Sequence, residues 1–363
     1  MNKVHLILYI CLGILLCSCR DNNTGERVLF QIDSYTVSSE DNFILPSYNL
    51  SVSVLQGGHQ GVMAYNYKTG DIDLFSDDSI WGTISLQKDG PNAVPGELVS
   101  LLPVSSDSIW VFNRESFYLI DKAGNVMAKH SPEYPVICEC NYAMNTAVAG
   151  WNPNGILSYP VKDGNTYKLI SYDVKSDQVV RTYELLYPES RTEDKFYGYL
   201  ELPNVSFQKD KAIYNFSYDC TVFVLDLQSG ETEKHTLPSK FAPQALPTLE
   251  RSSDPTTWLQ YGWENPHYYM VYYLSGPDIY IRPMLKGIDI SNRQNSDTII
   301  DEKQLVLAVI DSDFKLLDEI ELPKETYCNF HGWCSLPDGF LLYKDNALGK
   351  PHDDLMYDII RIR

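Results

Sequence analysis

Short apolar segments separated by tight turns recur along this chain at a nearly constant interval, which limits the folds open to it. Each copy contains a strand, a turn and a second strand, as in Phe117–Asp121, Lys122–Gly124 and Asn125–Met127. The turns are centred on Gly70, Gly124, Asp177, Gly230 and Asp313, so the successive intervals are 54, 53, 53 and 83 residues. The last interval exceeds one period of 53 by 30 residues, and polar insertions at 252–266 and 288–303 account for the excess.

A second series of turns keeps step with the first and marks an earlier hairpin in each unit. Its members are Ser106-Asp107, Pro153-Asn154-Gly155, Lys209-Asp210, Gly276-Pro277-Asp278 and Pro337-Asp338-Gly339. Two hairpins in every period give four strands per unit, which is the composition of a propeller blade. A pair of β-sandwiches would also contain short strands, but it does not predict a constant interval.

The periods predict six blades in a single all-β domain that covers residues 27–363. Their approximate ranges are 42–75, 97–130, 143–185, 202–237, 267–322 and 326–363. The last unit lacks a fourth strand, whereas the apolar segment Arg27–Ile32 has no unit of its own. We therefore expect this segment to pair with Ile359–Arg363, because the pairing closes the ring and removes two open sheet edges.

The pattern resembles a known class of proteins. Strands that end in Asp before Lys-x-Gly turns, and the loop Gly90–Glu97 ahead of a blade, are similar to features of the TolB-like six-bladed propeller lipoproteins of Bacteroidetes. The closest resemblance is to a family of unknown function in that group. It implies a propeller in the cell envelope, and it assigns no catalytic residue to this chain.

The N-terminus predicts export and a lipid anchor. Lys3 precedes the apolar run Leu6–Leu16, which is too short to span a membrane comfortably. The run ends in Leu16-Cys17-Ser18-Cys19, which resembles the bacterial lipobox, so we expect residues 1–18 to be a signal peptide and Cys19 to carry the lipid. Residues 19–26 would form a flexible tether. Arg20 after the cysteine favours the outer membrane, on either its periplasmic or its surface face.

Charge and motif content narrow the classes of function. The formal net charge of −19 disfavours nucleic acid as a partner, because such a chain repels phosphate. Cleavage before Cys19 leaves Cys138, Cys140, Cys220, Cys328 and Cys334, an odd number that excludes a complete disulfide framework, although Cys328 and Cys334 could pair. No phosphate-binding loop, hydrolase elbow or metal-binding motif is present, so we predict no cofactor and no metal.

Candidate binding residues gather in two aromatic segments. The first contains Trp258, Tyr261, Trp263, His267 and Tyr268, which would stack on a sugar ring or grip a peptide if they were exposed. The alternative is that the aromatic side chains fill the gap between two blades and that His267 and Tyr268 begin an inner strand.

The second segment contains His331 and Trp333 within Tyr327–Cys334, which we expect to be the innermost strand of the last blade. Together with His59 and His267, His331 would bring imidazoles near the channel, as a metal site or a general base requires. The sequence favours a non-enzymatic binding module, tethered to the membrane through Cys19, for a glycan, a peptide or an envelope protein. The alternative function is an envelope lyase or hydrolase with its site at the channel mouth.

Overall fold

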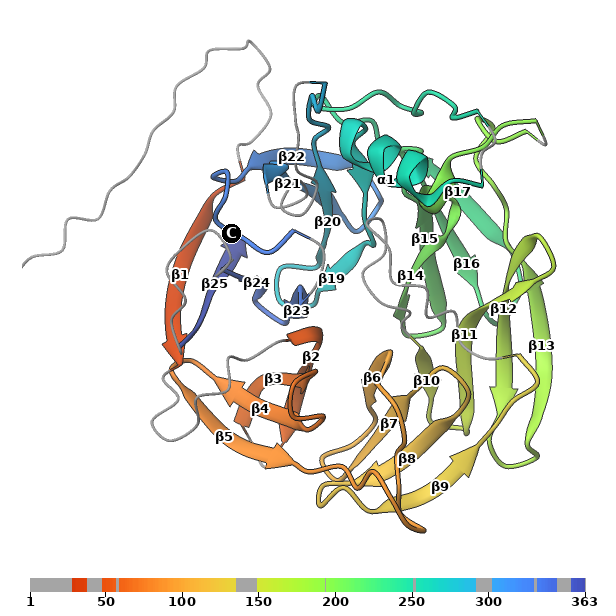
Figure 1. Ribbon diagram of the computed structural model, residues 1–363, viewed down its shortest axis with the longest axis vertical. Helices are drawn as coiled ribbons and strands as arrows, with labels where there is room; N and C mark the ends of the chain where they lie inside the picture. Colours follow the sequence, from red (N-terminus) through yellow and green to blue (C-terminus); the bar gives the residue numbers. More distant parts are fainter. Residues whose placement is uncertain are drawn as a thin grey trace, which may run out of the picture.

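The chain forms a ring of six antiparallel sheets arranged around a central axis (Figure 1). The structure is a computed structural model that describes residues 28–37, 48–56, 59–134, 149–192, 194–250, 253–291, 302–329, 332–344 and 354–362. The predicted all-β propeller with six blades is therefore confirmed.

The first three blades follow one another along the chain, each with its strands in sequence order. Blade 1 contains β2 (Tyr48–Gln56), β3 (His59–Asn66), β4 (Ile72–Ser76) and β5 (Ser79–Ile84). Blade 2 contains β6 (Ser100–Pro103), β7 (Ser108–Phe112), β8 (Phe117–Asp121) and β9 (Val126–His130). Blade 3 contains β10 (Gly150–Asn152), β11 (Ile156–Asp163), β12 (Thr166–Asp173) and β13 (Gln178–Glu184).

The remaining blades include one with a divided inner strand and one assembled from both ends of the chain. Blade 4 follows the short 3₁₀ helix Gly198–Glu201 and contains β14 (Pro203–Gln208), β15 (Lys211–Phe216), β16 (Thr221–Asp226) and β17 (Thr232–Thr236). In blade 5, β18 (His267–Tyr268) and β19 (Tyr272–Leu274) both pair with β20 (Ile279–Leu285), which precedes β21 (Leu305–Asp311) and β22 (Leu316–Glu321). Blade 6 contains β23 (Cys334–Leu336), β24 (Gly339–Tyr343), β25 (Leu355–Ile362) and β1 (Phe30–Val37).

The position of a strand within its blade decides its burial. The middle strands have a neighbouring blade on each face, so β21 reads Leu-Val-Leu-Ala-Val-Ile and all six side chains are buried. The outer strand β13, by contrast, exposes its first five residues. Continuous apolar runs in the sequence therefore mark middle strands, because both faces of those strands pack against other sheets.

The ring closes through the two ends of the chain, as the sequence predicts. β1 pairs with β25 over eight consecutive residues, with Phe30 opposite Ile362 and Ile32 opposite Ile360. Figure 1 shows the two strands side by side in blade 6. The rings of Tyr35 and Tyr357 stack across this pair with their centroids 5.3 Å apart. The N-terminal strand thus supplies the fourth strand that the last blade lacks.

Left-handed backbone conformations occur at most of the predicted turns. Gly124, Asp177 and Gly230 have φ angles of 83°, 57° and 81°, and each lies between the third and fourth strands of its blade. In blade 5 the left-handed residue is Phe314 with φ 58°, one position after the predicted Asp313. At the first three of these turns the left-handed residue is Gly or Asp, which are among the residues that tolerate positive φ most readily.

The first predicted turn was matched to the wrong hairpin. Gly70 lies between β3 and β4, which are the second and third strands of blade 1. The equivalent turn of this blade is at Asp77, with φ 50°, only 47 residues before Gly124. The predicted unit 42–75 therefore omits β5. The reason is that Lys-Thr-Gly and Lys-Ala-Gly turns are alike, so turn chemistry alone does not identify which hairpin it closes.

The segment between blades 4 and 5 contains a helix where the sequence indicated a loop. Helix α1 (Pro255–Glu264) begins with proline in its first turn, and the Asp254 side chain accepts a hydrogen bond from the Thr256 amide at 3.0 Å. At the other end, the buried Lys303 ammonium donates to the carbonyls of Gly262 and Asn265, both at 2.7 Å. None of the described helices is long and apolar enough to cross a membrane.

Candidate functional site

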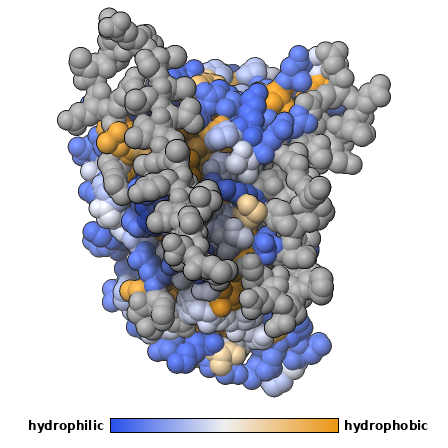
Figure 2. All heavy atoms as spheres, turned by 90° about the vertical axis from the view of Figure 1, so that its left-hand side faces the viewer, coloured by the Kyte–Doolittle hydropathy of each residue, from blue (hydrophilic) through white to orange (hydrophobic). Residues whose placement is uncertain are grey.

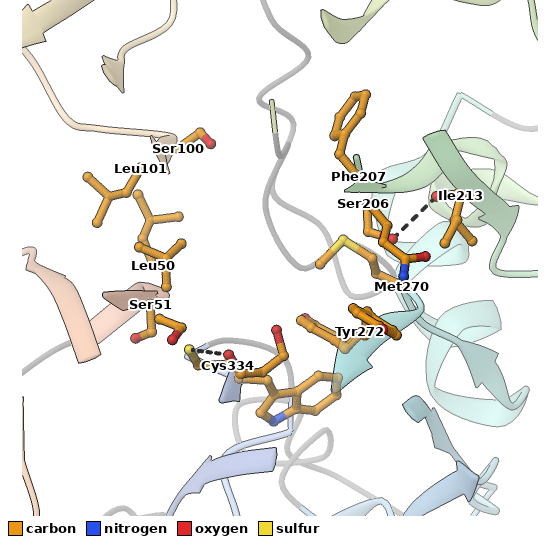
Figure 3. A pocket seen from close by; sticks show the side chains of 16 residues that line it. Leu50, Ser51, Ser100, Leu101, Ser206, Phe207, Ile213, Met270, Tyr272 and Cys334 are labelled. Carbon is orange, nitrogen blue, oxygen red and sulfur yellow. Dashed lines mark hydrogen bonds between the residues drawn. The ribbon is translucent and has the colours of Figure 1, made fainter. Parts of the chain in front are cut away.

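A cavity of about 230 Å³ lies at the centre of the ring, enclosed by the inner strands of five blades. Its lining comes from β2, β6, β14, β19 and β23, together with adjoining residues of blades 4, 5 and 6. The residues are Leu50, Ser51, Val52, Ser53, Ser100, Leu101, Ser206, Phe207, Gln208, Ile213, Met270, Tyr272, Tyr273, Trp333, Cys334 and Ser335. Figure 3 shows these side chains converging on one space.

Hydroxyl groups from four blades provide most of the polar lining. They belong to Ser51, Ser53, Ser100, Ser206 and Ser335. The Ser51 hydroxyl lies 2.8 Å from that of Tyr343, and the Ser206 hydroxyl makes a long contact of 3.5 Å with the Ile213 carbonyl. A hydroxyl group can both donate and accept a hydrogen bond, so this lining can bind ligand hydroxyls that act as donors or as acceptors.

Aromatic side chains form part of the remaining wall, and aliphatic side chains such as Leu50, Leu101 and Met270 form the rest. Trp333 is only 2% exposed, and its indole nitrogen donates to the Cys328 carbonyl at 2.9 Å, which fixes the ring at the cavity edge. Tyr273 and Phe207 are half-buried and leave part of each ring accessible. Aromatic faces beside hydroxyl groups are the combination that protein sites use for the apolar faces and the hydroxyls of sugars.

The cavity carries no formal charge. None of its described lining residues is Asp, Glu, His, Lys or Arg. Burial raises the pKa of the Cys334 thiol far above its usual range, so that thiol stays protonated. Elsewhere, the described residues contain no group of three or more His, Cys, Asp or Glu side chains that could hold a metal ion. The lining thus favours a neutral ligand.

A second, larger cavity of about 360 Å³ opens between blades 3 and 4. Small residues of blade 3 create it, because Gly150, Ser158 and Ser171 lie opposite one another on adjacent strands. The hydroxyls of Ser158 and Ser171 lie 2.9 Å apart on its floor. Phe207 lines this groove as well as the central cavity, and a Cβ on Gly150 would approach its ring to 2.5 Å. The Phe207 ring therefore separates the two spaces.

The aromatic segment of the helix is not the exposed surface that a ligand would need. Tyr261 and Trp263 are buried in α1, and the Tyr261 hydroxyl donates to the Pro247 carbonyl at 2.7 Å. Trp258 is half-buried, packs over Gly198 and makes an edge contact with Phe196 at 5.4 Å. Tyr261 packs in the cluster between blades 3 and 4, as the alternative noted in the sequence expected, whereas Trp258 packs on the segment that precedes blade 4.

His267 and Tyr268 are also buried, in blade 5. The His267 Nε2 atom lies 2.5 Å from the Gly262 carbonyl at the end of α1. The Tyr268 hydroxyl donates to the Pro243 carbonyl, and its ring lies 4.6 Å from the fully buried guanidinium of Arg282. Both side chains hold the helix and the neighbouring blade in place, and neither lines the central cavity.

Of the predicted site residues that the structure describes, Trp333 alone lines the central cavity. His331 and Cys19 lie outside the described residues, as does the His59 side chain. Cys328 and Cys334 are not joined by a disulfide bond. The five cavity serines were missed because a serine on a short strand carries no motif, although Ser51 and Ser53 do alternate on β2 as one face of a strand requires.

Comparison with protein families gives a match over most of the chain. Residues 27–321 match the family model described as a domain of unknown function, DUF4221. The chain belongs to the DUF4221 family. This membership confirms the predicted resemblance to a propeller family of unknown function. No curated protein matches the chain.

Solved structures support the same fold. A DUF4221 member from Bacteroides vulgatus superposes with a TM-score of 0.76 at 14% identity, covering 93% of this chain and 98% of that one. A Bacteroides fragilis protein assigned as exported gives a TM-score of 0.57 at 8% identity, covering 92% of this chain and 95% of that one. At such identities, the likeness to these two structures concerns the fold alone.

Proposed function

We propose that this chain is a non-enzymatic binding module of the bacterial envelope that holds a neutral saccharide unit in its central cavity. The observation that carries the proposal is the lining of that cavity, where hydroxyls of four blades face aromatic side chains without a charged group. A neutral lining binds a hydroxyl-rich ligand through hydrogen bonds and ring stacking. Glycans, peptides and envelope proteins were the ligands that the sequence favoured, and the cavity supports the first.

The size of the cavity supports a small recognised unit. Its volume of about 230 Å³ suits a single sugar ring and is too small for a folded partner. A longer glycan would place its terminal residue in the cavity and extend outward. The proposal does not require a catalytic residue.

The N-terminal signal supports a location in the envelope. We propose that Cys19 is lipidated after removal of residues 1–18 and that the propeller is displayed from the outer membrane on residues 19–26. The exported assignment of the Bacteroides fragilis structure is consistent with this location. Mass spectrometry of the N-terminal peptide from membranes tests the anchor, because a lipidated cysteine carries the mass of its acyl chains.

Binding of a panel of neutral mono- and disaccharides, measured by calorimetry, tests the site. Ser206→Leu fills the cavity with apolar atoms, so we expect it to weaken saccharide binding at least about tenfold, the cost of losing a hydrogen bond and the space it occupies. Ser108→Leu makes the same chemical change on β7, away from the cavity, and should leave binding intact.

The unfolding free energy of each variant separates loss of the site from loss of the fold. Both substitutions should change it by only about 1 kcal/mol, because neither serine is fully buried. Saccharide affinity that is equal in the wild type and Ser206→Leu would place the ligand elsewhere and refute the central site.

A further inference from the structure

The outer strands of five blades are protected against pairing with another chain. Four outer strands, β5, β9, β13 and β22, each carry one residue that has no partner on the neighbouring strand. This extra residue shifts the register and marks a β-bulge. The extra residues are Trp81, Met127, Val180 and Leu317. Outer strand β17 is regular, but Glu233 and Lys234 on it are exposed. Bulges and charged side chains are the usual means by which sheet edges avoid association.

The outer strand of blade 6 has neither form of protection. β1 is in regular register with β25 over all eight residues, and among described strands it pairs with β25 alone. Phe30 and Ile32 are 47% and 40% exposed, and Leu29 just before the strand is 68% exposed. Its carboxylate, on Asp33, is held by the Arg361 guanidinium at 2.7 Å. Figure 2 views this side of the molecule, where apolar surface interrupts a mostly hydrophilic exterior.

The chemistry of a free strand edge points to another strand as its cover. The outward N–H and C=O groups of β1 need hydrogen-bond partners, and a lipid surface does not supply them as fully as a strand does. An added strand satisfies these groups while its side chains cover the exposed apolar residues. Membrane contact is therefore the weaker explanation of the same patch.

The sequence of β1 is compatible with pairing to itself. A two-fold axis perpendicular to the sheet at Ser34 would place Ile32 opposite Thr36 and Asp33 opposite Tyr35 in the antiparallel partner. Among the residues of β1, no like charges would then face each other. Centring the axis at Asp33 would oppose two carboxylates, which is destabilising, so the charge pattern excludes that register and allows the one centred on Ser34.

We propose that β1 is the docking edge for β1 of a second copy of this chain, which joins two propellers through an antiparallel pair centred on Ser34. A single strand pair buries less surface than a stable dimer in solution needs, and the net charge of −19 on each copy opposes association. Anchoring both copies to one membrane raises their effective concentration. That last step rests on the lipid anchor proposed above, whereas the edge pairing does not.

Thiol cross-linking in membranes of cells that export the full chain tests this edge. Ser34→Cys places two thiols at the two-fold axis, and a short bifunctional thiol reagent should then trap a dimer. Thr236→Cys, on the exposed edge of β17, is the matched control. Because an oriented pair has a higher effective concentration than random collisions, we expect about fivefold more dimer from Ser34→Cys than from the control. The unsubstituted chain sets the background from its native thiols.

A second substitution separates edge pairing from mere proximity. Adding Ile32→Lys to the Ser34→Cys chain puts a charge on the edge and should reduce the dimer to the control level, while circular dichroism confirms an intact fold. Dimer from Ser34→Cys no greater than from Thr236→Cys would overturn the proposal. It would also be overturned if that dimer resisted Ile32→Lys, or if β1 amides of a chain without lipid gained protection from hydrogen exchange on the addition of vesicles. An N-terminal peptide without lipid, combined with cross-linking at high soluble concentration, would refute the anchor and leave the edge pairing standing.

Discussion

The junction where the ring closes and the junction between blades 3 and 4 are filled in different ways. Between blades 6 and 1, aromatic rings interlock: Tyr48 lies 5.9 Å from Tyr343, and Phe75 lies 5.5 Å from Tyr357. Hydrogen bonds reinforce the packing, since the Tyr357 hydroxyl donates to the Asp77 carbonyl at 2.6 Å. Blade 6, on one side of this junction, is the blade that both ends of the chain build, and the chain passes from its strand β1 to β2 of blade 1.

Between blades 3 and 4, packing is confined to part of the interface. A cluster that includes Tyr183, Tyr214 and Phe216 fills one part, whereas the small residues Gly150 and Ser158 leave the groove in the other. The chain connects the blades at both junctions, so the difference lies in their side chains. It teaches that interlocked rings fill the junction beside the blade shared by the two chain ends, whereas small residues leave space beside the central cavity.

The largest expected effect is a break in the closure. Tyr357→Ala removes a buried ring and its hydrogen bond to blade 1, so we expect a loss of about 3–5 kcal/mol in the free energy of unfolding. Urea denaturation measures it, and Tyr357→Phe, which keeps the ring, should lose only about 1 kcal/mol. Equal losses in the two variants would show that the ring itself does not hold the closure.

A smaller effect is expected at the open junction. Phe207 is half-buried beside a groove that can admit water, so Phe207→Ala should cost only about 1–2 kcal/mol by the same assay, well below a fully buried phenylalanine. It should also join the groove to the central cavity and let larger saccharides bind. A loss as large as that of Tyr357→Ala would remove the contrast between the two junctions.

The closure should also be sensitive to alkali, with an effect of about 1.4 kcal/mol per pH unit for one tyrosine. Burial, followed by the carboxylate of Asp73, raises the pKa of the Tyr48 phenol far above its usual value. The folded state then retains a proton that the unfolded chain releases above about pH 10. This contribution is complete below that pH and is lost as the pH rises further.

Unfolding free energies measured between pH 9 and 11 test that sign. The wild type should lose stability steeply above about pH 10. The slope for Tyr48→Phe, which has no phenol at this position, should be shallower by about 1.4 kcal/mol per pH unit. Identical slopes in the two proteins would mean that Tyr48 does not titrate with unfolding.

Most of the fold could be predicted from the sequence, because repeated hairpins place turn residues at a nearly constant interval. Gly124, Asp177 and Gly230 are equivalent turns, and the unpaired N-terminal segment indicated the closure with β25. The error at Gly70 arose because the same turn chemistry serves two hairpins of one blade. Periodicity identifies the unit but not the phase of each copy within it.

The central cavity was less accessible. Trp333 was found because a tryptophan near an inner strand is conspicuous, although that strand is β23 (Cys334–Leu336) and not the predicted Tyr327–Cys334. Ser206 and Ser335 become a lining only after five blades bring them together. Tyr261 and Trp263 in the helix were wrongly predicted to bind a ligand, because a segment rich in aromatic residues has the same composition whether it is exposed or buried. Burial is a property of the assembled ring, and local sequence does not report it.

The shared sixth blade has a consequence for how the protein comes into being. Residues 30–37 leave the ribosome early, yet their partner strand is made only when residues 355–362 have followed. Contacts between segments so far apart in sequence form late and slowly. The first strand to be synthesised is therefore the last to join its sheet. Until it does, the sixth blade is incomplete, and chaperones must keep its open edge from pairing with another chain.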